Sequence, residues 1–151
     1  MAPGASLHIG KVLDNDGSGQ DSWILAGMEW AARDQHAKIV SMSLGADATD
    51  GPDPLSQAVD SLSAETGTLF VIAAGNSGPA PYSVSTPGTA DAALTVGAVD
   101  SSDRLASFSS RGPRTGDNAL KPDARLTEHP GAEIICRYRA TAYITGQQAE
   151  E

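Results

Sequence analysis

Cysteine and basic residues are scarce in this sequence. The 151 residues contain one cysteine, Cys136, so no disulfide can form within the chain. Cys136 lies in an apolar segment that is typical of a buried strand, so we do not expect it to act as a nucleophile. Ten basic residues stand against nineteen acidic ones, and the formal net charge is −9. Because nucleic acids and anionic membranes repel a negative surface, we expect neither as a partner.

Long apolar runs and metal-ligand spacings are also missing. No run approaches the roughly 20 apolar residues of a membrane span. The first twelve residues, MAPGASLHIGKV, have neither the basic start nor the apolar stretch of a signal peptide, so we expect no export signal there. Neither a CxxC nor an HExxH pattern occurs, and we expect no metal and no cofactor.

What the sequence does contain is an alternation of strand and helix patterns. Apolar segments at 6–13, 38–45 and 68–75 each end at a glycine-containing turn. The segments between them have helical periodicity, at 21–37 and between Asp53 and Gly67. Two consecutive βαβ units of this kind predict an α/β fold with a parallel sheet and right-handed crossovers.

Helix ends and buried faces follow from the same pattern. Asp21 or Ser22 is expected to cap the first helix, and Asp53 followed by Pro54 to start the second. Gly67 is the expected C-cap of the second helix. The residues spaced to share the buried faces are Ile24, Met28, Ala31 and Ala32 in the first helix and Leu55, Ala58, Val59 and Leu62 in the second.

Further strands are expected after the third one. Residues 93–100 predict a fourth strand, 104–110 a short fifth and 132–139 a last one. Residues 141–151 carry no clear pattern, and we expect them to fray.

Parallel strands have a consequence for function. The loops that follow the first three strands read DGSG, SLGA and AGNSG, and all must emerge at one edge of the sheet. Ligands of open α/β sheets bind at that edge. The third loop ends a buried strand on Asn76, held between glycines, so this side chain is a candidate for the site.

Several motifs together resemble the middle of a subtilisin-like serine peptidase (subtilase) catalytic domain. They are KVLDNDGSGQDSWILAGMEWA, VSMSLG, FVIAAGNSGP, YSVSTPGTADAALTVGAVDSSDRLASFSSRGP and LKPD. The resemblance covers about residues 2–123. It implies a partial subtilisin-like three-layer fold in residues 1–123, followed by a divergent tail in 124–151, and an extended peptide or protein as substrate.

The resemblance also implies roles for individual residues. Asn76 matches the asparagine that donates its amide to the oxyanion, whereas from the residues alone it could simply cap a turn. Two segments match extended edges that bind the substrate backbone. They are Gly17, Ser18 and Gly19, and Ser43, Leu44 and Gly45. Ile24 and Leu44 match residues that line a pocket for one substrate side chain, although ordinary core packing is an alternative role for both. The pocket beside the cleaved bond has a wall that matches Ala73, Ala74 and Gly75.

The catalytic triad is not found in the sequence. Members of the family carry it in the order Asp, His, Ser, and the matched stretch lies between the His and the Ser. None of the three triad motifs is present, and after LKPD the match dissolves, as a truncation or a frame shift near residue 124 would produce. The residues considered and set aside as substitutes are His8, His36, His129, Ser109 and Ser110. We therefore expect no hydrolysis by this chain alone.

Other functions remain open at this point. The chain could be a non-catalytic peptide-binding module, or it could complement a separate polypeptide that carries the triad. A nucleotide-binding domain is a weak alternative, because Ser22 stands where the third glycine of GxGxxG belongs. Relatives of this kind are usually secreted, but the localisation of this chain stays undetermined. A partial domain leaves apolar surfaces open, so we expect an aggregation-prone product.

Overall fold

The computed structural model describes residues 4–47, 53–127 and 140–145, and these form an α/β fold around one parallel sheet. Its elements are β1 (Ser6–Lys11), α1 (Asp21–Glu29), the π-helix η1 (Trp30–Asp34), β2 (Ile39–Met42), α2 (Pro54–Thr66), β3 (Leu69–Ala73), β4 (Leu94–Val99), β5 (Ala124–Thr127) and β6 (Ala140–Thr145). All neighbouring strands pair in parallel, in the order β1-β6-β2-β3-β4-β5. The predicted parallel α/β class is confirmed.

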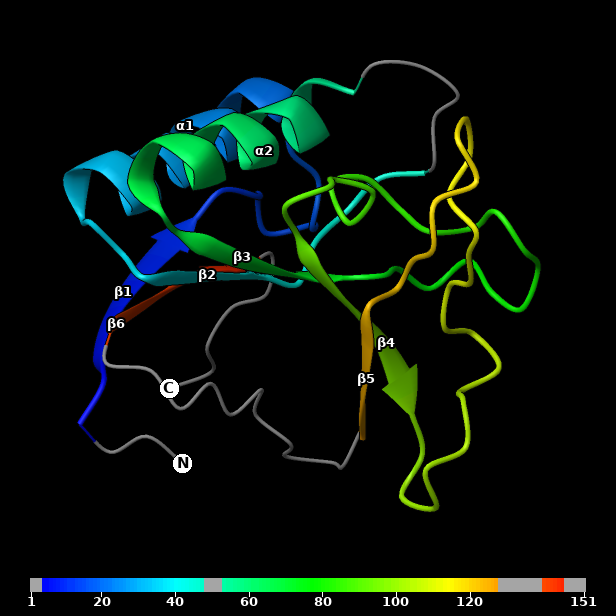
Figure 1. Ribbon diagram of the computed structural model, residues 1–151. Coiled ribbons are helices and arrows are strands. Elements are labelled where there is room, and N and C mark those ends of the chain that lie inside the picture. Colours follow the sequence, from blue (N-terminus) through cyan, green and yellow to red (C-terminus); the bar gives the residue numbers. More distant parts are fainter. Residues whose placement is uncertain (1–3, 48–52, 128–139, 146–151) are drawn as a thin grey trace.

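The core lies between the sheet and the two helices. Figure 1 shows α1 and α2 side by side over one face of the sheet. Alternate residues of β2 and β3 belong to this core, which also takes in Met28 of α1 and Val59 of α2. The intervening residues Ile39 and Val71 are buried as well, so β2 and β3 are covered on both faces, as is typical of central parallel strands.

The second helix begins and ends as the sequence predicts. The Asp53 carboxylate accepts hydrogen bonds from the backbone N–H groups of Leu55 and Ser56, at 3.1 and 3.0 Å. Gly67 ends the helix in the left-handed conformation, with φ 71°. Leu55, Val59 and Leu62 are buried, and Ala58 packs against the core.

The start of the first helix differs from the prediction. Its N-cap is Gln20, and no side chain caps it, so the expectation for Asp21 or Ser22 is wrong. Both residues already lie inside the first turn and are exposed, where their side chains face water. The helix continues as the π-helix η1, and the predicted face of Ile24, Met28, Ala31 and Ala32 is buried.

The strands after β4 were predicted least well. Residues 104–110 form no strand. The Asp100 carboxylate accepts the N–H groups of Ser102 and Arg104 and so closes a turn before this segment. Only one isolated bridge, between Val99 and Leu105, is formed there. The expectation that residues from 141 onward fray is wrong for 141–145. They form β6 with Ala140, and this strand is paired on both sides, with β1 and β2. The strand predicted at 132–139 lies outside the described residues.

Candidate active-site edge of the sheet

The loops that follow β1, β2 and β3 lie at one edge of the sheet. The parallel pairing of β1, β6, β2 and β3 places the carboxyl ends of these strands together. This confirms the expectation drawn from the strand pattern. The edge therefore collects the predicted site residues of three loops that are far apart in the sequence (Figure 1).

The loop after β3 fixes the backbone on both sides of Asn76. Gly75 has φ 102°, and a Cβ there would lie 2.0 Å from Ser85 Oγ, so only glycine fits this position. The Gly75 carbonyl accepts the N–H of Ser110 at 3.0 Å, and the N–H of Ser77 donates to Ser110 Oγ at 3.0 Å. The Asn76 side chain is exposed, and within the described part of the chain it makes no hydrogen bond. It is therefore available to a ligand and does not cap a turn in this structure.

The loop after β2 is held against the loop that contains Thr86. Ala46 and Thr86 form an antiparallel bridge with N–H···O distances of 3.0 and 3.1 Å. A Cβ on Gly45 would lie 2.8 Å from the Thr86 carbonyl oxygen, so glycine is needed for this close approach. Ser43 and Gly45 are exposed, whereas Leu44 between them is buried. This alternation leaves the backbone on either side of Leu44 accessible.

The loop after β1 is closed by its own aspartate. Asp14 Oδ1 accepts the N–H groups of Asp16 and Ser18, at 3.0 and 2.9 Å. Gly17 takes the left-handed conformation, with φ 79°, and the loop through Gly19 is exposed. The three predicted residues Gly17, Ser18 and Gly19 thus lie on a turn with a defined shape.

The predicted pocket residues fall into two groups. Ile24 and Leu44 are 7% and 8% exposed and belong to the same apolar cluster, where they pack as core residues. Ala74 is buried, while Ala73 and Gly75 are half-buried at the end of β3. Core packing and pocket lining both remain compatible with Ile24 and Leu44, so their role stays a prediction.

Sequence reasoning missed the residues that hold these loops. The Asp53 carboxylate accepts a hydrogen bond from the Thr86 hydroxyl and one from Ser56 Oγ at 2.5 Å. It thereby links the start of α2 to the loop that pairs with Ala46. Ser110 has the corresponding role beside Asn76. The only signal in the sequence was the density of hydroxyl residues in YSVSTPGT and SFSS, which does not specify partners.

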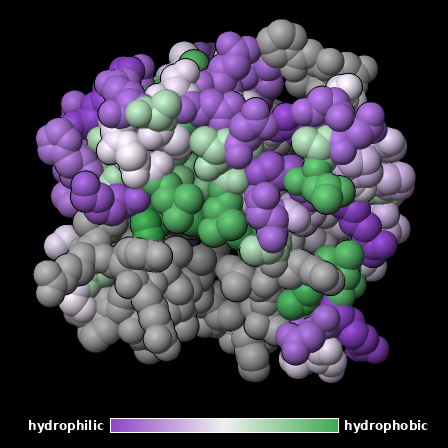
Figure 2. Space-filling model, in the orientation of Figure 1, coloured by the Kyte–Doolittle hydropathy of each residue, from purple (hydrophilic) through white to green (hydrophobic). Residues whose placement is uncertain are grey.

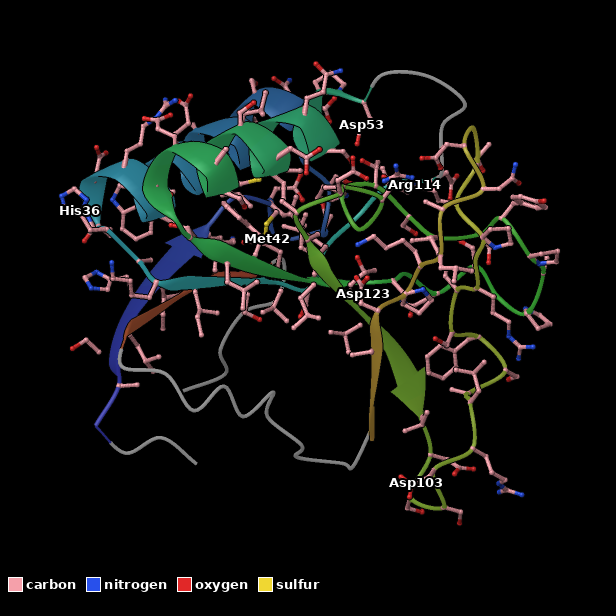
Figure 3. All side chains as sticks on the ribbon, viewed as in Figure 1. His36, Met42, Asp53, Asp103, Arg114 and Asp123 are labelled. Atoms are coloured by element: carbon pink, nitrogen blue, oxygen red, sulfur yellow. The ribbon has the colours of Figure 1, made fainter. Side chains whose placement is uncertain are left out.

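Three ion pairs fix the segments on either side of β4. Arg114 donates to the Thr89 carbonyl oxygen at 2.6 Å and pairs with Asp91 and Asp117. The hydrogen bonds from Arg114 hold the pKa of Asp117 well below its usual range. The nearly buried Lys121 donates to the Ala93 carbonyl oxygen and to Asp123, at 2.8 and 2.7 Å. Figure 3 shows that Arg114 and Asp123 lie on the side of the molecule away from His36.

The described residues contain no Ser-His-Asp arrangement. His8 packs edge-on against Trp30, with 6.4 Å between ring centroids. His36 is exposed at the far end of the helix layer (Figure 3), beside a surface depression of about 550 Å³ that is also lined by Arg33 and Glu65. Ser109 and Ser110 are fully buried and accept backbone N–H groups, so both hold the backbone in this structure.

Two further features are absent from the described part of the chain, namely a metal site and a membrane-spanning helix. Within residues 4–47, 53–127 and 140–145, no group of three or more His, Cys, Asp or Glu side chains could hold a metal ion. In the same ranges, no helix is long and apolar enough to cross a membrane.

Comparisons with known proteins agree with the fold and the loops. The profile of the subtilase family matches residues 1–128. The chain is 40% identical to pyrolysin of Pyrococcus furiosus over 82% of its length and 39% identical to the serine protease AprX of Bacillus subtilis over 95%. The solved structure of the S41 psychrophilic protease superposes on 77% of the chain, with a TM-score of 0.58 and 36% identity.

The chain belongs to the subtilase family of subtilisin-like serine peptidases. It spans only part of its relatives, namely 11% of pyrolysin, 35% of AprX and 40% of the S41 protease chain.

Proposed function

We propose that this chain is the substrate-binding and oxyanion-stabilising part of a subtilisin-like serine endopeptidase. In this proposal residues 1–123 are the peptidase-type part, and 124–151 are a divergent tail that still adds β5 and β6 to the sheet. The observation that carries the proposal is the state of Asn76. Its backbone is fixed by Ser110 on both sides while its side chain is exposed. A fixed amide donor is what a developing oxyanion requires.

The substrate is proposed to bind as an extended polypeptide between two loops. The exposed backbone of Gly17–Gly19 and of Ser43–Gly45 would pair with it as neighbouring strands pair in a sheet. Ile24 and Leu44 would line a pocket for one of its side chains, and Ala73, Ala74 and Gly75 would form a wall beside the cleaved bond. The family membership supports a peptide or protein as the substrate class.

We propose further that the chain does not hydrolyse peptides by itself. A subtilase needs a serine, a histidine and an aspartate in contact, and the described residues bring no such set together. Subtilisin itself is the reference case for this loss, which amounts to about a millionfold in rate. Incubation with a fluorophosphonate should therefore leave the chain unlabelled. Stoichiometric labelling of any serine would contradict the proposal.

Peptide binding without cleavage is the second candidate function. It is favoured by the intact loops, together with the lack of a Ser-His-Asp set among the described residues. It is tested by calorimetry with peptide aldehydes. A working cleft should bind them, and Gly17→Val should weaken this binding, because valine is strained at φ 79° and would distort the loop. Gly116→Val is the matched control, since Gly116 is also left-handed, at φ 102°, and likewise has open space around its Cβ position. Equal effects of the two substitutions would argue against a site at the first loop.

A further inference from the structure

The three asparagines of the chain differ in what their side chains contact. Asn15 Oδ1 accepts a hydrogen bond from Lys11 Nζ, and Asn118 Oδ1 accepts one from the Tyr82 hydroxyl at 3.0 Å. The Asn76 side chain is exposed and makes no hydrogen bond among the described residues. Of the three side-chain amides, that of Asn76 is therefore the least restrained.

The backbone nitrogen that follows each asparagine also has a different partner. The N–H groups directly after Asn15 and Asn118 each donate to a carboxylate, at 3.0 Å in both cases. The N–H of Ser77, which follows Asn76, donates instead to the neutral hydroxyl of Ser110, at 3.0 Å. A carboxylate binds an N–H more strongly than a hydroxyl does, and its charge opposes loss of the proton. The Ser77 nitrogen is therefore the one of the three that is most easily released.

Asn76 and Ser77 together carry the groups for an uncatalysed loss of the asparagine amide. The Ser77 nitrogen loses its proton to hydroxide and attacks Cγ of Asn76, so that an N–Cγ bond forms. The Cγ–Nδ2 bond breaks, and ammonia leaves after taking a proton from water. Water then opens the cyclic imide at either of its carbonyl carbons, which gives aspartate or isoaspartate. The net reaction consumes one water, releases one ammonia and involves no oxidant or reductant.

The surrounding structure restrains the attacking nitrogen. The N–H of Gly78 donates to the Phe108 carbonyl oxygen at 2.9 Å, and a Cβ on Gly78 would lie 2.0 Å from the Ser109 carbonyl oxygen. The loop is thus held closely against the segment that supplies the fully buried Ser110. The Ser77 nitrogen can give its proton to solvent only when its hydrogen bond to Ser110 opens.

Water, which the last step consumes, reaches this part of the molecule. The loops that follow β3 and β4 lie together on one side of the molecule, away from the helix layer (Figure 1). Figure 2 shows mainly hydrophilic residues on that side, with a few apolar ones among them. Asn76 and Ser77 are both exposed. Release of the Ser77 nitrogen is therefore the one structural change that the reaction requires.

We propose that Asn76 is a site of spontaneous deamidation, and that the Ser110 hydroxyl sets the rate of this reaction by holding the Ser77 N–H. The modification itself needs neither a substrate nor a triad. Its consequence rests on the proposed function, in which Asn76 donates to an oxyanion. A carboxylate at this position has no N–H to donate and repels a negative charge, so ageing of the chain removes the donor irreversibly.

Peptide mapping by mass spectrometry, with isoaspartate separated by chromatography, follows the reaction in the whole chain at mildly alkaline pH. We expect aspartate and isoaspartate to accumulate at Asn76 faster than at Asn15 or Asn118. Faster modification of either of the other two asparagines would contradict the assignment of the site.

Two serine variants test the role of the hydroxyl. Ser110→Ala removes the acceptor and should raise the rate at Asn76 by about three- to tenfold, as expected for the loss of one neutral hydrogen bond. Ser109→Ala is the matched control, because Ser109 is equally buried but accepts the N–H of Ala98. Its rate at Asn76 should stay close to that of the wild type. Equal rates in the two variants would overturn the proposal.

Two further measurements do not depend on whether Ser110→Ala folds. In the wild type, urea below the unfolding transition should raise the deamidation rate of Asn76 and the exchange rate of the Ser77 amide by the same factor, because both require the same opening. Ser77→Val keeps the backbone N–H but crowds the attacking nitrogen, so it should slow the reaction. A rise in only one of the two rates, or undiminished deamidation in Ser77→Val, would overturn the proposal.

Binding of peptide aldehydes separates the modification from its consequence. Deamidated protein should bind them more weakly than fresh protein. Equal binding by both would contradict the oxyanion role of Asn76, whereas the mass spectra would still establish the modification. The proposed function and the deamidation site can therefore fail independently.

Discussion

At the scale of single residues, substitution of Asn76 distinguishes a catalytic role of this side chain from a structural one. Its exposed side chain contributes no hydrogen bond among the described residues, so Asn76→Ala should change the free energy of unfolding by less than about 0.5 kcal/mol. In a chimera in which residues 1–123 replace the matched region of AprX, the same change should lower kcat by about 10²–10³, the loss for which subtilisin is the reference case. An unchanged kcat in an active chimera would refute the oxyanion role.

Ser110 is expected to act on stability and on the position of Asn76. Its buried hydroxyl accepts the N–H of Ser77, so Ser110→Ala leaves that group unpaired and should cost about 1–3 kcal/mol in urea unfolding. Ser109→Ala is the matched control, because Ser109 is equally buried and accepts the N–H of Ala98 at 3.0 Å. Both variants should be destabilised, but only Ser110→Ala should accelerate amide exchange at Ser77. Equal exchange at Ser77 in both would show that Ser110 does not hold this loop.

At the scale of secondary-structure elements, the two helices differ in how they begin. Gln20 has the extended backbone of an N-cap, with φ −94° and ψ 146°, but its side chain makes no capping hydrogen bond to the helix. Gln20→Ser should therefore stabilise the protein by about 0.5–1 kcal/mol. Asp53→Ala removes an existing cap and should destabilise it by about 1–2 kcal/mol. Thermal unfolding of both variants checks the pair, and a destabilised Gln20→Ser variant would contradict the argument.

The elements that the sequence predicts well are those fixed by local patterns. The β1–α1–β2–α2–β3 order follows from hydrophobic periodicity, and the ends of α2 follow from Asp53, Pro54 and Gly67. The strand β6 escaped prediction because its position depends on pairing with two distant strands, although Thr, Tyr and Ile in ATAYIT favour strands. The turn at Asp100 escaped because side-chain acceptance of two N–H groups outweighed a short apolar pattern.

The candidate site likewise has features that the sequence predicts and features that it does not. Parallel strand order was enough to place Gly17, Ser43 and Asn76 at one edge of the sheet. The contacts that hold these loops, from Asp53 to Thr86 and from Ser110 to Ser77, join residues about thirty positions apart. No local pattern specifies such partners, so only the structure reveals them.

At the scale of the whole molecule, the carboxylates set the response to acid. Partial burial acts to raise the pKa of Asp123, but hydrogen bonds from Lys121 and from the Thr95 N–H outweigh it and lower the pKa. Because the pKa is lower in the folded state, the ionised carboxylate stabilises the fold at pH values above the pKa of the unfolded chain, near 3.9. This stabilisation is lost as the pH falls through the pKa of the folded state. Between pH 6 and pH 3, the free energy of unfolding measured in urea should thus fall by less for Asp123→Asn than for wild type. Equal losses in wild type and Asp123→Asn would refute the coupling.

The balance between net charge and open apolar surface governs self-association. The formal charge of −9 keeps copies of the chain apart at low ionic strength, whereas Leu7 and Ile9 present apolar surface on an edge strand. At about 0.5 M salt the charges are screened beyond a few ångströms, so the wild type should show a larger mass in light scattering than at low salt. Ile9→Lys should suppress this increase, since it puts a charge on the edge strand. Leu120→Lys is the control, because Leu120 is 87% exposed but lies outside the strands. If both substitutions reduce association equally, general loss of apolar surface is responsible and β1 is not the site of contact.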